Sequence, residues 1–562
     1  MMNQVQEICV TPPRQQISDL DNLPLVDHSL VDYETYNKFI GQAMVKNRIS
    51  LFATRGCPYK CAYCHKIWPK RHYVRSAGNL MEEVQLYYDM GIRRFSFIDD
   101  IFNLDKKNSM EFFESIIQRG LKLQLLFPAG LRGDILTRDY IDLMIEAGTV
   151  NFALALETGS PRIQRYIRKN LKLDKFRENI EYACHQYPHV ILELQTMLGF
   201  PGETEDEALM TLDFIKSLKW LHFPYVNVLK IFPHTDMEKL AFENGISREA
   251  IIKSRDLSYD QLPLTLPFSK HFAIQYQADF LHNYFLNTER LMAVLPYQMK
   301  LLTEDEMAQK YDNYLSFQVK SMDHLLEYAG ITREELGINH CVPEDTFHVP
   351  DLNEKIKRAF PAKTPAADAL KILLLDLSRS LSCGKEVLYD VVEPPLGLMY
   401  LLTYLNHRLG SKINGKILKS GIDFQSFREL ESLIRQFEPD VIGIRTLSLF
   451  RNYFHETVEM IRGWKPRVPI IAGGPYASSD YESILLDPNV DLVVLGEGEI
   501  TFCELIEKVV ENSGKLPETD TLKAIAGLAF TARRQVDSKT IGPEPADGRQ
   551  KLSGLMDDLE NE

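Results

Sequence analysis

The stretch that decides the fold is Arg55-Gly56-Cys57-Pro58-Tyr59-Lys60-Cys61-Ala62-Tyr63-Cys64-His65. Its cysteines have the spacing C-x3-C-x2-C and directly follow the apolar run of residues 49–53, which predicts a strand. Loops after strands are where α/β folds place their chemistry. Three thiolates can hold three irons of a four-iron cluster and leave the fourth iron open to a substrate or cofactor. The pattern therefore predicts Cys57, Cys61 and Cys64 as metal ligands.

A zinc knuckle completed by the adjacent His65 is the alternative for the same stretch. Structural zinc sites more often use two paired C-x2-C or Cys/His units. No second pair follows here at a suitable spacing. We favour the iron–sulfur interpretation on spacing and position.

Residues 49–245 alternate short apolar runs with amphipathic stretches. This alternation predicts βα units, a parallel sheet and, as the simplest closure, a partial (β/α)6 barrel. The predicted strands are residues 49–53, 94–98, 123–127, 150–156, 191–198 and 225–232. The predicted helices include residues 110–119, 138–146, 173–184 and 205–218.

The flanking segments differ in composition. Residues 1–48 are rich in Pro, Asp and Asn and predict an extended arm. Residues 246–360 are helical in pattern, aromatic and Met-rich, and we expect a helical domain that packs its own apolar stripe, although part of it could cap the barrel mouth. Residues 361–369, with two prolines among small side chains, predict a linker.

A second α/β domain is expected over residues 370–535. Its predicted strands are residues 371–376, 441–445, 470–472 and 492–495, with helices at 396–409, 424–437, 453–463 and 500–512. This is the pattern of a doubly wound, Rossmann-like sheet, which binds ligands at the carboxyl ends of its strands. Residues 536–562 predict a disordered acidic tail.

Charge and cysteine usage limit the function classes. The formal net charge of -14 argues against general nucleic-acid binding. No apolar run is long enough to span a bilayer, and the N-terminus lacks the pattern of a targeting signal, so we expect no membrane association and residence in the cytoplasm. Five of the eight cysteines are scattered, which suits reduced thiols.

The strand ends of the first domain carry Asp99-Asp100, Glu157-Thr158-Gly159 and Gly199-Phe200-Pro201-Gly202. Together with the cysteine triad and Tyr63, the aromatic residue before its third cysteine, they resemble the Elp3/MiaB-like branch of the radical S-adenosylmethionine (SAM) enzymes. The resemblance implies a [4Fe-4S] cluster whose open iron binds SAM. It also implies that Glu157 meets the ribose or amino-acid end of SAM and that backbone near Gly199 lines the adenine. Asp99 and Asp100 stand where many relatives carry Gly-Gly-Glu.

The second domain resembles the cobalamin-binding domain of B12-dependent radical SAM enzymes. The resemblance rests on Glu393-Pro394-Pro395-Leu396-Gly397-Leu398, Gly473-Gly474-Pro475 and Gly496-Glu497-Gly498-Glu499. The D-x-H-x-x-G sequence that supplies a histidine to cobalt in many B12 proteins is missing. The lower face of cobalt is then expected to be open or met by the loop of Thr446 to Ser448. The residues expected to hold the cofactors are Tyr63, Asp99, Asp100, Glu157, Gly199, Thr446, Ser448, Gly473, Gly474, Pro475, Gly496 and Glu497.

The order of the domains differs from most relatives, in which the cobalamin domain precedes the barrel. Residues 11–35 resemble the connection that normally leads from the cobalamin domain into the barrel. We interpret this as a circular permutation, in which residues 361–369 join the former termini.

These resemblances imply that the chain is a cobalamin-dependent (class B) radical SAM enzyme, and we expect it to methylate an unactivated carbon in a biosynthetic pathway. Its partners would be a small-molecule or carrier-bound biosynthetic substrate and an electron donor such as flavodoxin or ferredoxin. One rival is radical SAM cyclisation, rearrangement or oxidation, with a C-terminal domain that is only a scaffold. The other is a non-catalytic metal-binding interaction protein. No catalytic residue beyond the cluster ligands is assigned.

Overall fold

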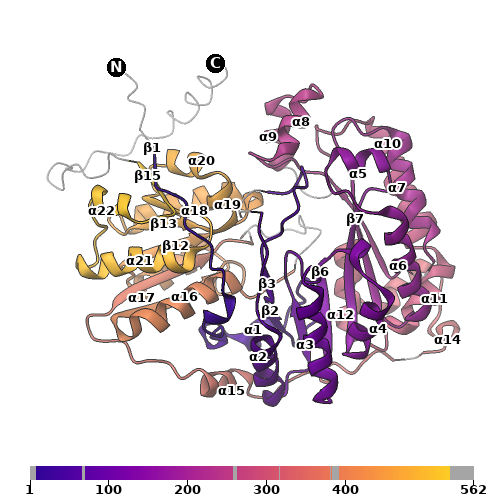
Figure 1. Cartoon of the computed structure of the whole chain (residues 1–562), viewed down its shortest axis with the longest axis horizontal. Helices are drawn as coiled ribbons and strands as arrows, with labels where there is room; N and C mark the ends of the chain where they lie inside the picture. Colours follow the sequence, from indigo (N-terminus) through magenta and orange to yellow (C-terminus); the bar gives the residue numbers. More distant parts are fainter. Residues whose placement is uncertain are drawn as a thin grey trace.

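The computed structural model describes residues 8–65, 70–219, 221–256, 262–315, 317–338, 340–379, 381 and 391–531. Two large sheets lie side by side, one of six strands in the N-terminal half and one of seven strands in the C-terminal half (Figure 1). The expected acidic tail, residues 536–562, lies outside the described residues. No helix in the described ranges is both long enough and apolar enough to cross a membrane.

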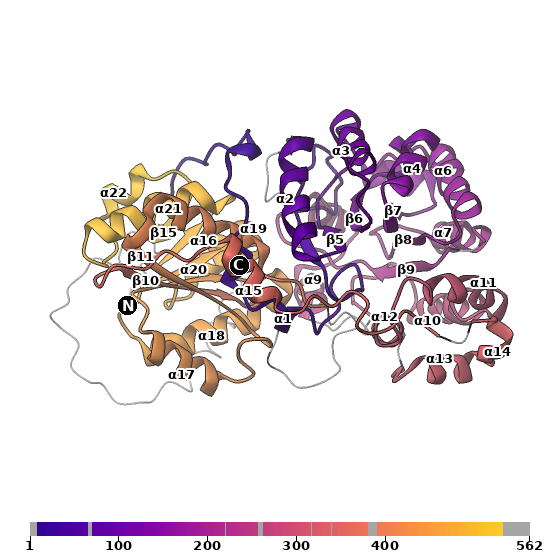
Figure 2. The same ribbon diagram turned by 90° about the horizontal axis from the view of Figure 1, so that it is seen from below.

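The N-terminal sheet is an open, all-parallel sheet in the order β2-β5-β6-β7-β8-β9. Because β2 and β9 are its two edges, the barrel is partial, as predicted. The strands are β2 (Ile49–Leu51), β5 (Arg94–Phe97), β6 (Gln124–Leu131), β7 (Thr149–Glu157), β8 (Ile191–Leu198) and β9 (Phe223–Val228). Helices cover its outer side (Figure 2): α2 (Ala77–Met90), α3 (Lys106–Gln118), α4 (Arg138–Glu146), α6 (Leu173–Gln186) and α7 (Glu205–Ser217).

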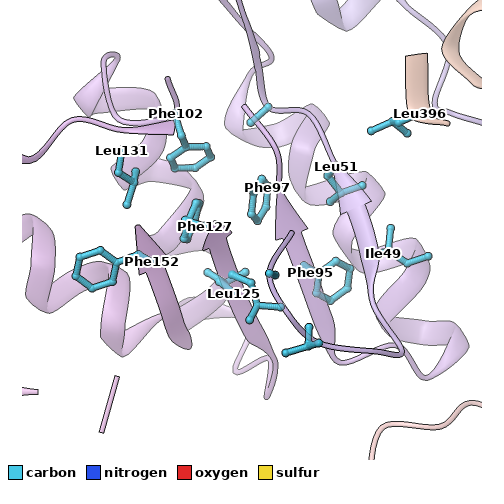
Figure 3. Packing of buried hydrophobic residues seen from close by; sticks show 14 of the residues in the cluster. Ile49, Leu51, Phe95, Phe97, Phe102, Leu125, Phe127, Leu131, Phe152 and Leu396 are labelled. Carbon is cyan, nitrogen blue, oxygen red and sulfur yellow. The ribbon is translucent and has the colours of Figure 1, made fainter. Parts of the chain in front are cut away.

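Aromatic side chains fill the core of this half (Figure 3). The rings of Phe97 and Phe127, on β5 and β6, are stacked with their centroids 5.0 Å apart, and the ring of Phe102 packs against both. Leu396 of the C-terminal half belongs to the same buried cluster as Leu51. The two halves therefore share this apolar cluster, while the C-terminal half has a second cluster of its own on the other face of its sheet.

Helices follow the barrel strands: α8 (Asp236–Glu243), α9 (Arg248–Asp256), α10 (Lys270–Phe280), α11 (Thr288–Gln298), α12 (Glu304–Tyr314), α13 (Met322–Ala329), α14 (Arg333–Leu336) and α15 (Leu352–Ala359). Helix α12 covers the end of the sheet where strands begin. Its Glu306 accepts from Arg94 at 2.5 Å, at the start of β5, and its Lys310 donates to Glu193 at 2.7 Å, near the start of β8. Apolar side chains of this segment belong to the same buried cluster as the barrel, with the rings of Phe285 and Tyr311 against Phe223 of β9, so its apolar stripe packs against the barrel as well as on itself. Helix α12 closes the end opposite the mouth.

The C-terminal sheet has the order β1-β15-β14-β13-β12-β10-β11, and its strands are parallel except for β15, which runs antiparallel to both of its neighbours, β14 and β1. Its strands are β1 (Ile8–Val10), β10 (Leu370–Asp376), β11 (Ile413–Lys419), β12 (Val441–Arg445), β13 (Ile470–Gly473), β14 (Leu492–Val494) and β15 (Leu528–Thr531). Its helices are α16 (Leu396–Leu409), α17 (Phe427–Phe437), α18 (Arg451–Trp464), α19 (Gly474–Ser479), α20 (Tyr481–Leu486), α21 (Gly498–Glu511) and α22 (Thr519–Ala524).

Helices cover both faces of this sheet, as a doubly wound fold requires (Figure 2). Alternate residues of β10 explain why. Ile372 and Leu374 belong to the buried cluster that includes α16 and α21, whereas Leu373 and Leu375 belong to the cluster that includes α17 and α18. A strand that is apolar on both faces is buried on both sides.

The N-terminal arm connects the two halves. Strand β1 pairs antiparallel with β15, and the backbone N–H of Asp27 donates to Thr403 on α16 at 3.0 Å. The arm then reaches the barrel, where Tyr87 on α2 donates to the carbonyl of Val26. The segment expected to be an extended arm thus contributes a strand to the C-terminal sheet, and residues 11–35 pass from one half to the other.

Candidate functional site

The three cysteines lie on the loop after the short strand β3 (Thr54–Arg55), which pairs with β4 (Tyr73–Val74). All three thiols are free and half-buried. Ala62, between the second and third cysteines, is held in place from two sides: its N–H donates to the carbonyl of Ile167 at 2.8 Å, and its carbonyl accepts from Met237 N–H at 2.9 Å. The loop is therefore fixed against the barrel at its centre.

The cysteine loop offers three free thiols, which is the number of protein ligands that a four-iron cluster with one open iron needs. Among the residues that the structure describes, no three His, Cys, Asp or Glu side chains converge on a point where one ion would bind. A four-iron cluster binds each thiolate at a different iron, so its sulfur ligands are spread more widely. Burial raises the pKa of the Cys57 thiol above its usual value. It raises the pKa of the Cys64 thiol to about 11, so a metal has to displace a proton from these thiols when it binds.

Tyr63 and Glu157, both singled out in the sequence, are in direct contact. Glu157 ends β7 with φ at 67°, an unusual conformation for a residue with a side chain. Its Oε1 accepts from the Tyr63 hydroxyl and from Lys169 Nζ, each at 2.9 Å. The aromatic residue before the third cysteine is thereby tied to the end of the fourth barrel strand.

The two aspartates after β5 lie in different environments. Asp99 is buried, and its Oδ1 accepts from the Ala53 N–H at 2.9 Å and the Thr54 hydroxyl at 2.7 Å. Burial raises the pKa of Asp99 to about 7. Asp100 is exposed and lines the large cavity described below. Asp99 thus holds the turn in front of the cysteine loop, and Asp100 is the one that faces a ligand space.

Gly199 directly follows β8 and has a left-handed conformation, with φ at 96°. A side chain there would collide with Leu266, since a Cβ would lie 2.4 Å from its Cδ2. The N–H groups of Gly199 and Phe200 donate to Glu203 Oε2 at 2.8 and 3.1 Å. Glu203, which the sequence did not single out, therefore fixes this turn, and burial raises its pKa to about 7.

A cavity of about 300 Å³ lies between the two halves. The N-terminal half contributes the residues around β3 and Asp100, and the C-terminal half contributes strand ends and the start of α16 and α21. Gly473, Gly474, Pro475, Gly496 and Glu497, all predicted from sequence, line it together. The rest of its wall includes Phe52, Thr54, Arg55, Gly56, Gly397, Leu398, Tyr400, Leu401, Gly443, Arg445, Gly498, Glu499 and Phe502.

Glycines open one side of this cavity. A Cβ added at Gly397, Gly473 or Gly496 would meet no atom within 4 Å. Their backbone therefore faces free space, and a flat ligand could approach it closely. Apolar side chains such as Leu398 and Phe502 supply much of the remaining wall. Polar groups that fix a ligand in a largely apolar pocket are typical of cofactor sites.

Thr446 and Ser448 do not line the cavity. The Thr446 hydroxyl donates to the carbonyl of Leu377 at 2.8 Å, and the Ser448 hydroxyl lies 3.4 Å from that of Ser479. Arg445, one residue earlier, is in the wall instead. No histidine belongs to the wall as far as the structure describes it.

Arg445 is held by a buried carboxylate at the end of β10. Asp376 accepts from Arg445 Nη1 and from Lys419 Nζ, each at 3.0 Å. Although burial opposes it, these two cations hold the pKa of Asp376 below its usual range.

The sequence did not indicate Arg55, Phe52 or Tyr400 as cavity residues. Arg55 adjoins the cysteine triad, and that adjacency was the one signal for it. Tyr400 lies on α16, one turn after the opening glycine Gly397. Nothing in the sequence around Phe52 or Tyr400 indicates that they meet residues of the other half.

Comparisons with known proteins match two protein families to different parts of the chain. The radical SAM superfamily matches residues 51–215, and the B12 binding domain matches residues 388–506. The first range includes the cysteine stretch, and the second includes the C-terminal walls of the cavity. These matches confirm the predicted resemblance, including the C-terminal position of the second domain.

Curated relatives match in part. Uncharacterized methyltransferase PH0819 of Pyrococcus horikoshii is 26% identical over 42% of this chain and 50% of its own length. The anaerobic magnesium-protoporphyrin IX monomethyl ester cyclase of Synechocystis is 29% identical over 41% and 44%. Cytidylyl-2-hydroxyethylphosphonate methyltransferase of Streptomyces wedmorensis is 26% identical over 36% and 40%. The chain thus spans half or less of the length of these relatives.

Solved structures also overlap in part. The radical SAM methyltransferase TsrM from Kitasatospora setae aligns with a TM-score of 0.33 at 18% identity, over 37% of this chain and 38% of that chain. The cobalamin-dependent radical SAM enzyme OxsB aligns with a TM-score of 0.35 at 11% identity, over 55% and 53%.

Proposed function

We propose that this chain, which contains a radical SAM domain followed by a B12 binding domain, is a cobalamin-dependent radical SAM enzyme that methylates an unactivated carbon in a biosynthetic pathway. One observation carries the proposal. The cavity of the B12 binding domain is closed on its other side by Arg55 and Gly56, the residues that precede the first cysteine. A radical generator and a methyl carrier need such proximity, because a substrate must reach both within one turnover.

The residues divide into two sets of roles. Cys57, Cys61 and Cys64 would hold a [4Fe-4S] cluster, and Tyr63, Asp100, Glu157 and Gly199 would surround SAM at the barrel mouth. Asp99 would act indirectly, by holding the turn in front of the loop. The bound groups would supply a carbon-centred radical and a transferable methyl group.

The lining of the cavity suits cobalamin, because it combines bare glycine backbone with apolar side chains and a few polar groups. Gly473 and Gly496 present bare backbone to the open space, as contact with a flat macrocycle requires. Since the histidine of D-x-H-x-x-G is missing and none lines the described wall, we propose that no imidazole binds cobalt. Thr446 and Ser448 are poor candidates for the lower face because their hydroxyls already have partners outside the wall.

The partners follow from the chemistry. We propose a small-molecule or carrier-bound substrate and an external one-electron donor such as flavodoxin or ferredoxin. Cytoplasmic residence is part of the same proposal, because a cluster and half-buried free thiols need reducing conditions.

Anaerobic purification with reconstituted iron and sulfide, followed by incubation with SAM, a reductant and hydroxocobalamin, tests the proposal. We expect about four irons per chain, bound cobalamin, and formation of both 5'-deoxyadenosine and S-adenosylhomocysteine. If the chain binds no iron, the proposal that it is a radical SAM enzyme is refuted, and the alternative of a non-catalytic interaction protein is left.

A second candidate is radical cyclisation or oxidation without methyl transfer. The similarity to the Synechocystis cyclase supports this candidate. The product pattern separates the two: 5'-deoxyadenosine without S-adenosylhomocysteine supports the second candidate.

A further inference from the structure

A buried salt bridge joins the cysteine loop to the B12 binding domain at the wall of the shared cavity. Arg55 Nη2 donates to Glu499 Oε1 at 2.6 Å, and Arg55 Nη1 lies 3.6 Å from Glu497 Oε1. The side chains are 17%, 9% and 5% exposed, respectively. The guanidinium also lies over the ring of Tyr400, 5.2 Å from its centroid. We call these four side chains the Arg55 bridge.

On one side, the Arg55 bridge is tied closely to the first cysteine. Arg55 is paired with Tyr73 in the β3–β4 ladder, and only Gly56 separates it from Cys57. Gly56 has φ at 80°, and a Cβ there would lie 2.5 Å from the carbonyl oxygen of Arg71. Because one glycine alone separates the two residues, and the backbone there is paired with Tyr73 and packed closely against Arg71, we expect a displacement of Arg55 to move Cys57 as well.

On the other side, Glu497 and Glu499 of the Arg55 bridge lie in the loop and first turn of α21 that form part of the cavity wall. Glu497 is the N-cap residue of α21, and its Oε2 accepts from the Ile17 N–H of the arm at 2.9 Å. Gly496 and Gly498, on either side of it, line the cavity. Arg55, Glu497 and Glu499 line it too, so a ligand in this space touches both partners of the salt bridge.

We propose that the Arg55 bridge couples the two cofactor sites, so that an iron–sulfur cluster on the cysteine loop strengthens cobalamin binding in the cavity, and the reverse. The inference rests on the proposed function. A cluster fixes Cys57 and therefore Arg55, whereas cobalamin fixes the loop that holds Glu497 and Glu499. Since both events require the same arrangement of one salt bridge, the first lowers the conformational cost of the second. Arg55 is in this sense a positioning residue.

Hydroxocobalamin binding to the full-length chain tests this coupling. The dissociation constant is measured by absorbance titration under anaerobic conditions, once with the reconstituted cluster and once after chelation of iron, with circular dichroism to show that the chelated chain is folded. The readout is the dissociation constant measured without the cluster divided by the dissociation constant measured with it. We expect the wild-type chain to bind at least about fivefold more tightly with the cluster present, the lower end of typical coupling between sites.

Arg55→Lys and Glu499→Gln should each bring this ratio to about one, and the double variant should behave like either single variant, because all three changes disrupt the same contact. Arg14→Lys is the matched control. Arg14 is 19% exposed and bonds the same helix through Glu504 at 3.0 Å and Thr501 at 3.2 Å, but it does not line the cavity. It should leave the ratio as in the wild type.

A wild-type ratio of about one would overturn the inference. A wild-type ratio in Arg55→Lys and Glu499→Gln would overturn it too, even if both variants bound hydroxocobalamin more weakly with and without the cluster. An equal loss of affinity in both states indicates a merely structural role. A wild-type chain that binds no hydroxocobalamin in either state would overturn the proposed function together with the inference, so the two failures are distinguishable.

Discussion

Replacing Gly473 by leucine should abolish cobalamin binding without unfolding the chain. Gly473 ends β13 with φ at −151°, an extended conformation that any residue adopts. A Cβ there meets no atom within 4 Å and points into the free space of the cavity. The folded chain therefore accepts the new side chain without strain, and the free energy of unfolding should change by no more than about 1 kcal/mol.

The same leucine removes space that a ligand needs. With a cavity of about 300 Å³, the added branched side chain lies between the glycine backbone and a flat ligand. We expect the affinity for hydroxocobalamin to fall at least hundredfold, which corresponds to about 2.7 kcal/mol. Absorbance titration of the purified variant measures this loss, and urea denaturation measures the stability beside it.

Gly463→Leu is the matched control, because Gly463 lies on the exposed side of α18 and a Cβ there also meets nothing within 4 Å. It should bind hydroxocobalamin as the wild type does. If Gly473→Leu is folded and binds with wild-type affinity, cobalamin does not occupy this cavity, and the reasoning from the glycine backbone is refuted.

Three further predictions concern the metal, the pH dependence and the closed end of the barrel. Cys57→Ala should lose most of its iron after reconstitution whereas Cys184→Ala, at a buried thiol of α6, should keep it; equal iron contents would contradict the cluster assignment. Burial raises the pKa of Asp99 from 3.8 to about 7, so its protonated form stabilises the fold below about pH 4 and this contribution is lost as the pH rises to 7. Between pH 4 and 7, urea denaturation should show the free energy of unfolding of the wild type falling by at most about 4 kcal/mol relative to that of Asp99→Asn. Parallel pH profiles of the two proteins would contradict this prediction. Glu306→Ala leaves Arg94 buried without its partner and should lower the free energy of unfolding by about 3–5 kcal/mol; a loss below about 1 kcal/mol would mean that the pair is hydrated.

Much of the secondary structure could be predicted because it depends on local patterns. Helices α4 and α16 and strands β8 and β12 have the predicted bounds. Strand β11 was missed because Asn414, Gly415 and Lys416 interrupt its apolar run. Its pairing with β10 over seven residues overrides this weak local preference. Strand β1 was missed because a three-residue strand has too little sequence to show a period.

The candidate site divides in the same way. The spacing of the cysteines and the strand-end glycines are local features, and they were sufficient to indicate two cofactors. Thr446 follows a predicted strand end as closely as Gly473 does, and Ser448 lies two residues further along the same loop, yet their hydroxyls face Leu377 and Ser479 rather than the cavity. Position along a strand sets which end of the sheet a residue reaches, but side-chain direction depends on partners that the sequence does not name.

The sequence by itself determined that three thiolates lie after a strand, that two α/β domains follow one another, and that no histidine accompanies the first strand of the second domain. Only the tertiary structure decided that these parts meet. The contact of Arg55 with Glu499 joins residues 444 positions apart, and the arm places β1 beside β15 at the far end of the chain. Such contacts depend on how whole sheets pack against each other, and the apolar core that both halves share fixes that arrangement.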